Sequence, residues 1–310
     1  MQRRTLGKTG LEVSVIGFGS GPIGFLQIDA RRVGTILNWL LDQGVNLIDT
    51  AAMYLGSEQA IGQSVGHRRD EYVLVSKCGP AYEDLPGEAW SAEVIAHTVD
   101  RALKRLRTDH LDVMLLHSCD LAILERGTAL EALLRAREAG KVRFVGYSGD
   151  NQPAAYAAAL PDMAVIETSI NICDQANIDL VLPKTQAHHV GVIAKRPLAN
   201  AAWKPLADQP GIYSDYARTY SDRFRLLAGE LAALGLEDDA KTAWPERALR
   251  FTLAQPGVHA AIVGTTSADH ARVNLAIAGK GPLDPDAVRA LRSAFRHAES
   301  KAGQEWLGQA

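Results

Sequence analysis

The sequence is poor in cysteine, nearly balanced in charge and free of long apolar runs, and each of these features excludes a class of protein. Its 310 residues include three cysteines, Cys78, Cys119 and Cys173, which are scattered and odd in number and make no disulfide framework. The formal net charge of −3 gives no electrostatic reason to expect nucleic acid or an anionic membrane as a partner. No apolar run approaches the roughly 20 residues that span a bilayer.

The start of the chain and its composition indicate where the protein works and how it is divided. The first residues, MQRRTLGKTG, show no basic run followed by an apolar core and a small-residue cleavage site, which predicts a cytoplasmic protein in a reducing compartment. Hydrophobic residues make up 47% and charged residues 22%, as expected of one large globular domain or two small ones. Because no linker or composition shift divides the chain, we expect a single domain over residues 1–310.

Short β-rich runs alternate with longer amphipathic runs along most of the chain. The expected strands are 13–19, 45–51, 72–79, 111–118, 141–149, 163–170, 190–198 and 259–265. The expected helices are 30–44, 57–65, 91–109, 121–139, a short one from Pro153, 176–189, 244–254 and 268–278. Repeated βα units imply parallel strands with right-handed crossovers. Eight such units predict a closed α/β barrel of the (β/α)8 TIM type, with an open doubly wound sheet as the alternative.

The connection after the seventh expected strand is unusually long. Residues 199–243 are expected to be irregular and carry several aromatic side chains: Trp203, Tyr213, Tyr216 and Tyr220. Loops of this length are usually functional lids or flexible segments. An extra helix is expected near the C-terminus.

Four ionisable side chains fall at one end of three neighbouring strands. Asp49 ends the second expected strand, Lys77 the third and His117 the fourth, while Tyr54 lies five residues after Asp49. In a barrel of this kind, chemistry is carried out at the carboxyl ends of the strands. We therefore expect these four residues to form one constellation.

The chemistry of that constellation is proton transfer to a substrate oxygen. Tyrosine, with an ordinary pKa near 10, is a poor proton donor at neutral pH, but a nearby lysine cation favours the phenolate. A carboxylate fixes the ammonium, and a histidine orients the substrate oxygen. The set forms a general acid for the alkoxide that arises when a carbonyl accepts hydride, and the hydride itself requires a cofactor.

Each of these residues also has a purely structural interpretation. Asp49 and Lys77 are alternatively an ion pair at the barrel rim, Tyr54 a loop tyrosine and His117 a hydrogen-bonded histidine. The joint placement of all four favours the site. His117-Ser-Cys-Asp120 lacks a second ligand pair at metal spacing, so we expect no metal. Gly19-Ser-Gly21-Pro-Ile-Gly24 matches G-x-G-x-x-G, but we interpret it as a loop after the first strand, near cofactor and substrate, rather than as a Rossmann phosphate cradle.

Six segments resemble the aldo-keto reductase family, over most of the chain from about Arg4 to Ala278. They are NLIDTAAMY (46–54), LVSKCG (74–79), DVMLLHS (112–118), EAGKVRFVGYS (138–148), GVIAKRPL (191–198) and IVGTTSADHARVN (262–274). The resemblance implies a (β/α)8 barrel, an extended NAD(P)H bound without a Rossmann fold, and reversible carbonyl reduction. It also implies that Asp49, Tyr54, Lys77 and His117 form the catalytic tetrad, with Tyr54 as proton donor.

The resemblance further implies a set of cofactor-binding residues. They are Gly19, Ser148, Glu167, Lys195, Arg196, Pro197, Leu198, Gly264, Thr265, Thr266, His270 and Asn274. Several depart from the family pattern. Gly149 follows Ser148 where the family has asparagine, and Glu167 replaces the usual glutamine but still offers an acceptor to the carboxamide. Lys195 stands where an aromatic usually stacks on the nicotinamide.

The charged departures bear on the choice of cofactor. Lys195 and Arg196 are candidate phosphate contacts, because a fixed cation favours an anion. Thr265 and Thr266 precede a helix whose N-terminus suits phosphate. His270 stands where many NADP-preferring members have arginine. We expect NADP(H) to be favoured, with NAD(H) as the alternative.

The substrate pocket is expected to contain three aromatic side chains beside the tetrad. Phe25, Trp90 and Trp203 are its candidates, with Trp203 as a replacement for the missing stacking ring. Their apolar character suggests a small or hydrophobic carbonyl substrate, or the matching alcohol. The leading hypothesis is an NAD(P)H-dependent oxidoreductase for an aldehyde, ketone or sugar. The alternative is a cofactor-binding regulatory or sensor protein on the same barrel with negligible turnover.

Overall fold

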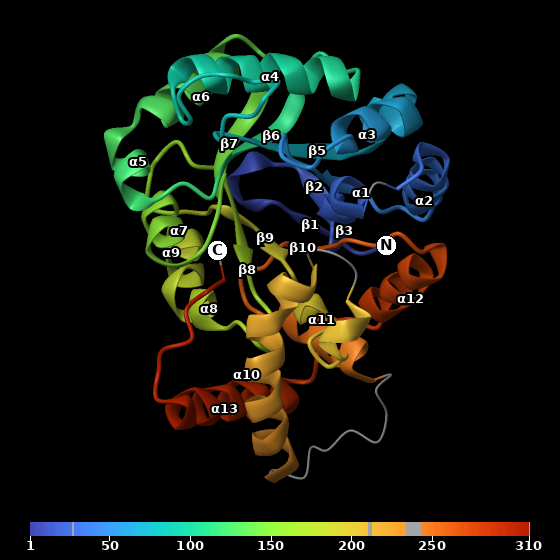
Figure 1. Cartoon of the computed structure of the whole chain (residues 1–310), viewed down its shortest axis with the longest axis vertical. Coiled ribbons are helices and arrows are strands. Elements are labelled where there is room, and N and C mark those ends of the chain that lie inside the picture. The colour runs from blue at the N-terminus through green and yellow to red at the C-terminus, as the bar shows by residue number, and fades with distance from the viewer. Residues whose placement is uncertain (27, 210–212, 234–242, 310) are drawn as a thin grey trace.

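Eight parallel strands close into a barrel, as the sequence predicts (Figure 1). The computed structural model describes residues 1–26, 28–209, 213–233 and 243–309. In the order of pairing the strands are β10 (Ala260–Val263), β3 (Ile16–Gly19), β4 (Leu47–Asp49), β5 (Val73–Cys78), β6 (Leu111–His117), β7 (Val142–Ser148), β8 (Val165–Ser169) and β9 (Gly191–Lys195). Because β10 pairs with both β3 and β9, the sheet has no open edge. The alternative of an open doubly wound sheet is therefore wrong.

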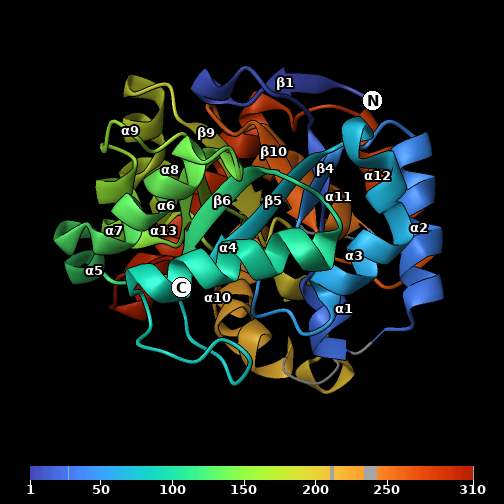
Figure 2. The ribbon, with the colours of Figure 1, turned by 90° about the horizontal axis from the view of Figure 1, so that it is seen from above.

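The first expected strand, 13–19, is in fact two strands with different roles. β2 (Glu12–Ser14) pairs antiparallel with β1 (Arg3–Thr5), and only β3 belongs to the barrel. The break is fixed by Ser14, whose hydroxyl donates to the Ile16 carbonyl and whose amide donates to Asn46 Oδ1. The hairpin, with the short helix η1 (Gly7–Thr9) between its strands, contributes Leu6 and Val13 to the apolar cluster that also contains Leu47 of the barrel. It thus covers the amino-terminal end of the barrel, opposite the predicted site (Figure 2).

Helices surround the barrel close to their expected positions. They are α2 (Ala30–Asp42), α3 (Ser57–Val65), α4 (Ala92–Leu106), α5 (Leu121–Arg126), α6 (Thr128–Glu138), α7 (Asn151–Ala157), α8 (Ala176–Leu180), α9 (Leu182–Ala187), α11 (Ala243–Leu253) and α12 (Ala268–Gly279), with the short helix η2 (Gly66–Glu71) after α3. Ser91 caps α4 as predicted, because its hydroxyl accepts from the Val94 amide. The expected helix 121–139 is divided at Gly127, whose φ of 79° interrupts the α-helix.

A second apolar cluster lies beside the barrel. It is formed by α10 (Tyr213–Ala233), α11, α13 (Pro285–Ala302) and the C-terminal segment after α13. Figure 1 shows α10 and α13 together below the barrel. The expected extra C-terminal helix is α13. No helix in the described part of the chain is both long and apolar enough to cross a membrane.

The prediction that residues 199–243 are irregular is wrong over 21 of them. After the short helices η3 (Ala199–Ala201) and η4 (Leu206–Asp208), α10 buries Ala217, Tyr220, Leu227 and Leu231 on one face. The steps between these positions are three, seven and four residues, as on one face of an amphipathic helix. Charged residues between these positions weaken the hydrophobic periodicity that would have indicated the helix in the sequence. Of the expected aromatic residues, Tyr220 is buried, whereas the side chains of Tyr213 and Tyr216 lie outside the described part of the structure.

Candidate active site

The alternation of side chains along the strands brings the predicted polar residues together. Leu47, Val75, Leu115, Val165 and Ile193 belong to the apolar cluster that fills the barrel. In each of these strands the residue two positions later points to the same side of the sheet. The five residues in question are Asp49, Lys77, His117, Glu167 and Lys195. The barrel core therefore ends in a polar layer at the carboxyl ends of the strands.

Lys77 is the centre of this layer. Its side chain is 0% exposed, and its Nζ lies 2.6 Å from Asp49 Oδ1 and 3.3 Å from Glu167 Oε2. The ammonium also donates to the Thr50 carbonyl at 3.1 Å. One buried cation thus holds two buried carboxylates, of which sequence analysis assigned only Asp49 to it.

Tyr54 and His117 stand between Lys77 and the cavity. The Lys77 Nζ lies 5.5 Å from the centroid of the Tyr54 ring. The Tyr54 and His117 rings meet edge to face, with centroids 6.2 Å apart and an interplanar angle of 90°. Phe25 contacts the other side of Tyr54 at a centroid distance of 5.3 Å. The structure therefore brings all four predicted catalytic residues together.

The surroundings set the protonation states of these groups. Burial lowers the pKa of His117 well below its usual range, and the positive charges of Lys77, Lys195 and Arg196 lower it further, so the imidazole is neutral. Burial alone would lower the pKa of Lys77, but Asp49 and Glu167 outweigh it and raise that pKa, so the ammonium stays charged. Burial raises the pKa of Tyr54 to about 12, with Lys77 acting in the opposite direction. Tyr54 is therefore protonated at neutral pH, as a proton donor must be.

The backbone of Tyr54 is held in place by a glycine that sequence analysis assigned to a loop. Gly24 lies in the short helix α1 (Gly21–Leu26), which begins two residues after β3. A Cβ atom on Gly24 would lie 2.6 Å from the Tyr54 carbonyl carbon and 2.7 Å from the Leu55 nitrogen. Glycine at this position therefore permits the close approach of the Tyr54 backbone, and the expectation of an irregular loop over these glycines is wrong from Gly21 onward.

The predicted site residues surround one cavity of about 800 Å³. Every candidate residue lines it except Lys77, which lies beneath it. Volumes in this range are typical of cofactor and ligand pockets. Met53, Pro80, Ser118, Asn200, Lys204, Gln209 and Pro245 also line the cavity and were not predicted. Pro245 lies in the first turn of α11, and the others lie in connections between the longer strands and helices, where the sequence carries no periodic signal.

The two cations after β9 have partners inside the protein. Lys195 Nζ lies 2.9 Å from Asp150 Oδ2, and Asp150 also accepts from the Ser169 amide and Asn177. Arg196 donates to Ser169 Oγ at 3.3 Å and to the Gln309 carbonyl. Phosphate contacts by Lys195 and Arg196 remain predictions, and any such contact would share cations already paired. Asp150 was not predicted because it lies two positions beyond the segment 138–148, which carries the resemblance.

The residues near α12 suit an anion. Ser267 caps α12 by accepting from the His270 amide, and Thr265, Thr266, His270 and Asn274 line the cavity beside it.

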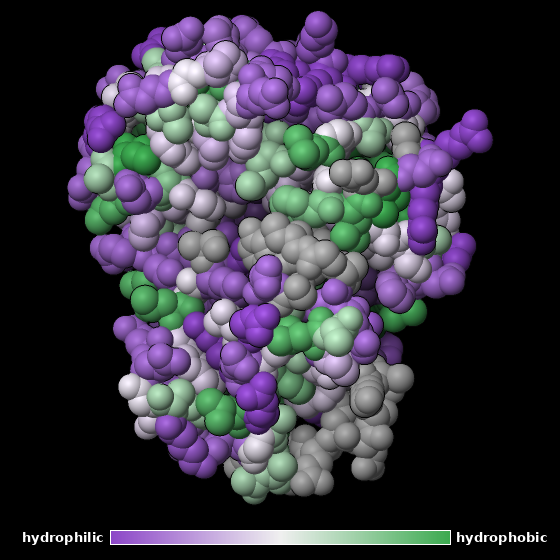
Figure 3. All heavy atoms as spheres, in the orientation of Figure 1, coloured by the Kyte–Doolittle hydropathy of each residue, from purple (hydrophilic) through white to green (hydrophobic). Residues whose placement is uncertain are grey.

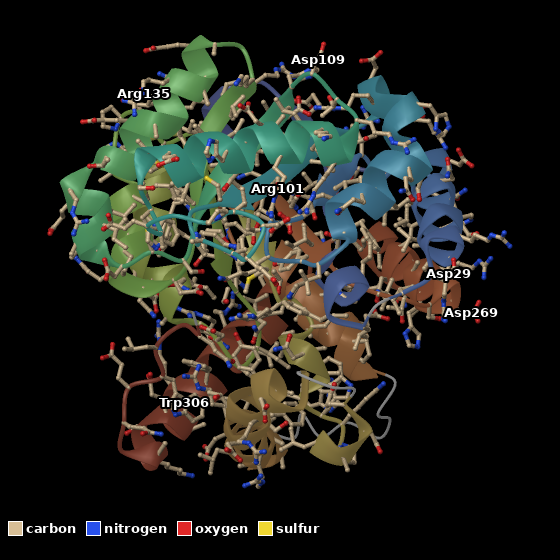
Figure 4. The ribbon with its side chains drawn as sticks, turned by 45° about the horizontal axis from the view of Figure 1, so that its top comes forward. Asp29, Arg101, Asp109, Arg135, Asp269 and Trp306 are labelled. Carbon is tan, nitrogen blue, oxygen red and sulfur yellow. The ribbon has the colours of Figure 1, made fainter. Side chains whose placement is uncertain are left out.

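In Figure 4, Asp29 at the start of α2 and Asp269 in the first turn of α12 are labelled near one another at the edge of the molecule. Arg272 pairs with Asp269 at 2.7 Å and lies over the Trp39 ring, so its charge is directed away from the cavity.

The hydrogen-bond partners of the Glu167 carboxylate indicate whether a nicotinamide fits this cavity. Its Oε1 accepts from Ser148 Oγ at 3.1 Å, whereas its buried Oε2 forms an ion pair with Lys77 Nζ at 3.3 Å but accepts no hydrogen bond from any described residue. A carboxamide amine is a donor that this oxygen lacks. The residues present therefore fit the group, through Ser148 and Glu167.

The site combines a buried lysine with a tyrosine, a histidine and an acid at the carboxyl end of a (β/α)8 barrel. This combination defines a class of oxidoreductases that act on carbonyls, and comparison with known proteins gives the same class. The profile of the Aldo/keto reductase family matches residues 15–296. The chain belongs to this family.

Individual relatives span nearly the whole chain. An uncharacterized oxidoreductase, YqkF of Bacillus subtilis, is 27% identical over 303 residues, which cover 94% of this chain and 96% of the relative. The L-galactose dehydrogenase of Arabidopsis thaliana is 26% identical over 299 residues, covering 89% and 88%. The structure is similar to the holo form of aldo-keto reductase AKR11C1 from Bacillus halodurans, with a TM-score of 0.77, 25% identity, and coverage of 95% and 96%.

Proposed function

We propose that the protein is an NAD(P)H-dependent oxidoreductase that reversibly reduces an aldehyde, ketone or sugar carbonyl, with Tyr54 as general acid. The observation that carries the proposal is the placement of Tyr54 and His117 on the cavity wall directly above the buried Lys77–Asp49 pair. The name of the Arabidopsis relative adds support for a sugar among the candidate substrates.

The chain's own residues carry out the proton transfer. Neutral His117 and the Tyr54 hydroxyl hydrogen-bond the substrate oxygen and orient it. The Tyr54 O–H then gives its proton to that oxygen, and the Lys77 ammonium stabilises the phenolate that remains. Asp49 holds the ammonium in place. The nicotinamide cofactor supplies the hydride.

The remaining candidate residues have supporting roles in this proposal. Ser148 and Glu167 hold the carboxamide, the residues at 195–198 and Gly19 border the cofactor, and Gly264, Thr265, Thr266, His270 and Asn274 hold its phosphates and adenosine. His270 favours NADP(H), with NAD(H) as the alternative. Phe25, Trp90 and Trp203 border the substrate. Trp203 is half-buried and packs against Phe224 of α10, with ring centroids 6.3 Å apart.

The test is the variant Tyr54→Phe. Oxidation of NADPH, and separately of NADH, is measured across a panel of aldehydes, ketones and aldoses. We expect the variant to lose at least about a hundredfold in kcat, the usual contribution of a general acid, while cofactor binding is kept. Tyr156→Phe on α7, outside the cavity, is the matched control and should retain full activity.

Two results would contradict the proposal. Substantial activity in Tyr54→Phe would exclude this residue as the acid. Tight cofactor binding by a folded wild-type protein without turnover on any member of the panel would favour the regulatory or sensor role instead.

A further inference from the structure

The buried ion cluster below the cavity contains one carboxylate more than its lysine can neutralise. Asp49 and Glu167 both lie within ion-pair distance of Lys77 Nζ, at 2.6 and 3.3 Å, and both side chains are 2% exposed. Ser148 donates a single neutral hydrogen bond to Glu167. When all three groups are ionised, the cluster has a net charge of −1. Burial and the negative charge of Glu167 raise the pKa of Asp49 well above its usual range, against the opposing effect of Lys77.

The neighbouring charges do not compensate for this excess. Lys195 is paired with Asp150. Arg196 lies close to the second buried acid of this region, Asp174, which accepts from the Tyr220 hydroxyl and the Gln309 amide. Two cations thus face two acids on this side. His117, which also lines the cavity, is neutral because burial, the Lys77 charge and these two cations lower its pKa.

The surplus negative charge belongs to Glu167, which faces the cavity where the nicotinamide cofactor would bind. Glu167 lines the cavity together with Tyr54 and His117, the residues proposed to hold the reacting oxygen. A cofactor that exchanges hydride with a substrate held there must place its nicotinamide ring beside the same residues. The oxidised ring is a cation and the reduced ring is neutral, so only the oxidised form is attracted by a carboxylate.

We propose that Glu167 makes this site discriminate between the two redox states of the nicotinamide, by binding the oxidised form more tightly than a neutral amide at the same position would. The inference rests on the proposed function. Because stabilising the bound oxidised form shifts the equilibrium between the bound states toward oxidised cofactor and alcohol, this discrimination favours reduction of the carbonyl on the enzyme, the direction of that proposed function.

Lys77 does not cancel this effect. Its charge repels the oxidised ring, but Asp49, at 2.6 Å, is its nearer counter-ion and neutralises it at short range. The additional charge is that of Glu167. Replacing it by glutamine keeps the side-chain length and the acceptor toward Ser148, removes the charge, and puts an amide NH2 in the place of Oε2, 3.3 Å from Lys77 Nζ.

The experiment compares the dissociation constants of the oxidised and reduced cofactors for wild type and Glu167→Gln. Binding is followed by quenching of tryptophan fluorescence, since Trp90 and Trp203 line the cavity, and is checked by calorimetry. We expect the ratio of the oxidised to the reduced dissociation constant to rise about tenfold in Glu167→Gln, as for loss of one partly screened charge interaction. Glu131→Gln on α6 makes the same chemical change outside the cavity, and should leave the ratio within about twofold of wild type.

Each result decides the matter. An unchanged ratio in a Glu167→Gln protein that binds both forms overturns the inference and leaves the proposed function intact. If that variant does not fold, the wild-type constants decide: equal or tighter binding of the reduced form overturns the inference, and tighter binding of the oxidised form supports it. Binding of neither form by the wild type overturns the proposed function as well.

Discussion

At the scale of single residues, the site depends on protonation states that burial and neighbouring charges impose. Tyr54 carries its proton because burial raises its pKa to about 12, and Lys77 stays charged because two carboxylates surround it. Burial and the Glu167 charge also raise the pKa of Asp49, against the opposing effect of Lys77. The sequence identified the tetrad by residue type and strand end, but not the contact between Lys77 and Glu167. That contact depends on the alternation within β8 and on its place across the barrel.

The pH dependence of carbonyl reduction follows from these states. His117 has a pKa well below 6.5, and Tyr54 has one near 12, so neither group titrates around neutrality. We expect kcat/KM for reduction to be flat from about pH 6 to about pH 9, with activity lost only as the pH falls far enough to protonate His117. The profile is measured in buffers of constant ionic strength.

The same histidine affects stability in acid. The unfolded chain protonates His117 near its ordinary pKa of 6.5, whereas the folded chain does not, so the free energy of unfolding decreases as the pH falls below about 6.5. His117→Asn removes this contribution. It is the control both for the pH profile of kcat/KM and for the free energy of unfolding measured as a function of pH. A step in kcat/KM with a midpoint near 6.5 that disappears in His117→Asn would contradict the assigned neutral state.

At the scale of elements, the predictions succeeded where hydrophobic periodicity was strong. The apolar runs of β5 and β6 and the Ser91 cap of α4 were visible in the sequence because local chemistry fixes them. The helices α1 and α10 were missed. α1 contains Gly21, Pro22 and Gly24, which disfavour a helix interior, and tertiary contacts override that preference.

Gly24 gives a test of how α1 positions the catalytic tyrosine. In Gly24→Ala the new methyl group meets the backbone at Tyr54 and Leu55, which must move. We expect kcat to fall about a hundredfold, since a displacement near 1 Å has this effect, with a loss of about 1–3 kcal/mol in the free energy of unfolding from overpacking. Both quantities are measured on the purified variant, the second by urea denaturation.

The matched control is Gly229→Ala on α10. A Cβ atom on Gly229 meets nothing within 4 Å, so this change should leave kcat unaltered and stabilise the protein by up to about 1 kcal/mol. Wild-type kcat in Gly24→Ala would show that α1 does not position Tyr54.

At the scale of the whole molecule, the barrel was predictable and its attachments were not. Eight βα repeats fix the barrel because parallel strands with right-handed crossovers close in few ways. The second apolar cluster depends on contacts between segments far apart in the chain, such as α10 and α13. Figure 3 shows the surface in the orientation of Figure 1. Apolar residues gather in the middle of the visible face, near the position of α1 and below mostly hydrophilic helices.

The C-terminal segment connects this second cluster to the active site. Trp306 is 2% exposed, with its ring 5.1 Å from that of Phe295 and beneath the Arg223 guanidinium at 5.5 Å. Figure 4 labels it beside α13. Two residues later Gly308 donates to Asn151 at 2.6 Å, and the Gln309 carbonyl accepts from Arg196 on the cavity wall. Anchoring of Trp306 therefore fixes a contact of Arg196, whose φ of 56° lies in the left-handed region.

We expect Trp306→Ala to lower the free energy of unfolding by about 3–5 kcal/mol, as is usual when a buried large aromatic is removed. Cofactor binding by the folded variant should weaken several-fold, because Arg196 and the segment after it lose the partner that holds a strained conformation. Urea denaturation and fluorescence titration measure the two effects.

Leu307→Ala is the matched control: its side chain is 46% exposed, and surface substitutions of this kind change stability by about 0.5 kcal/mol or less. Equal denaturation midpoints for the two variants would show that the C-terminal segment is not anchored through Trp306, and unchanged cofactor affinity would show that Arg196 is held without it.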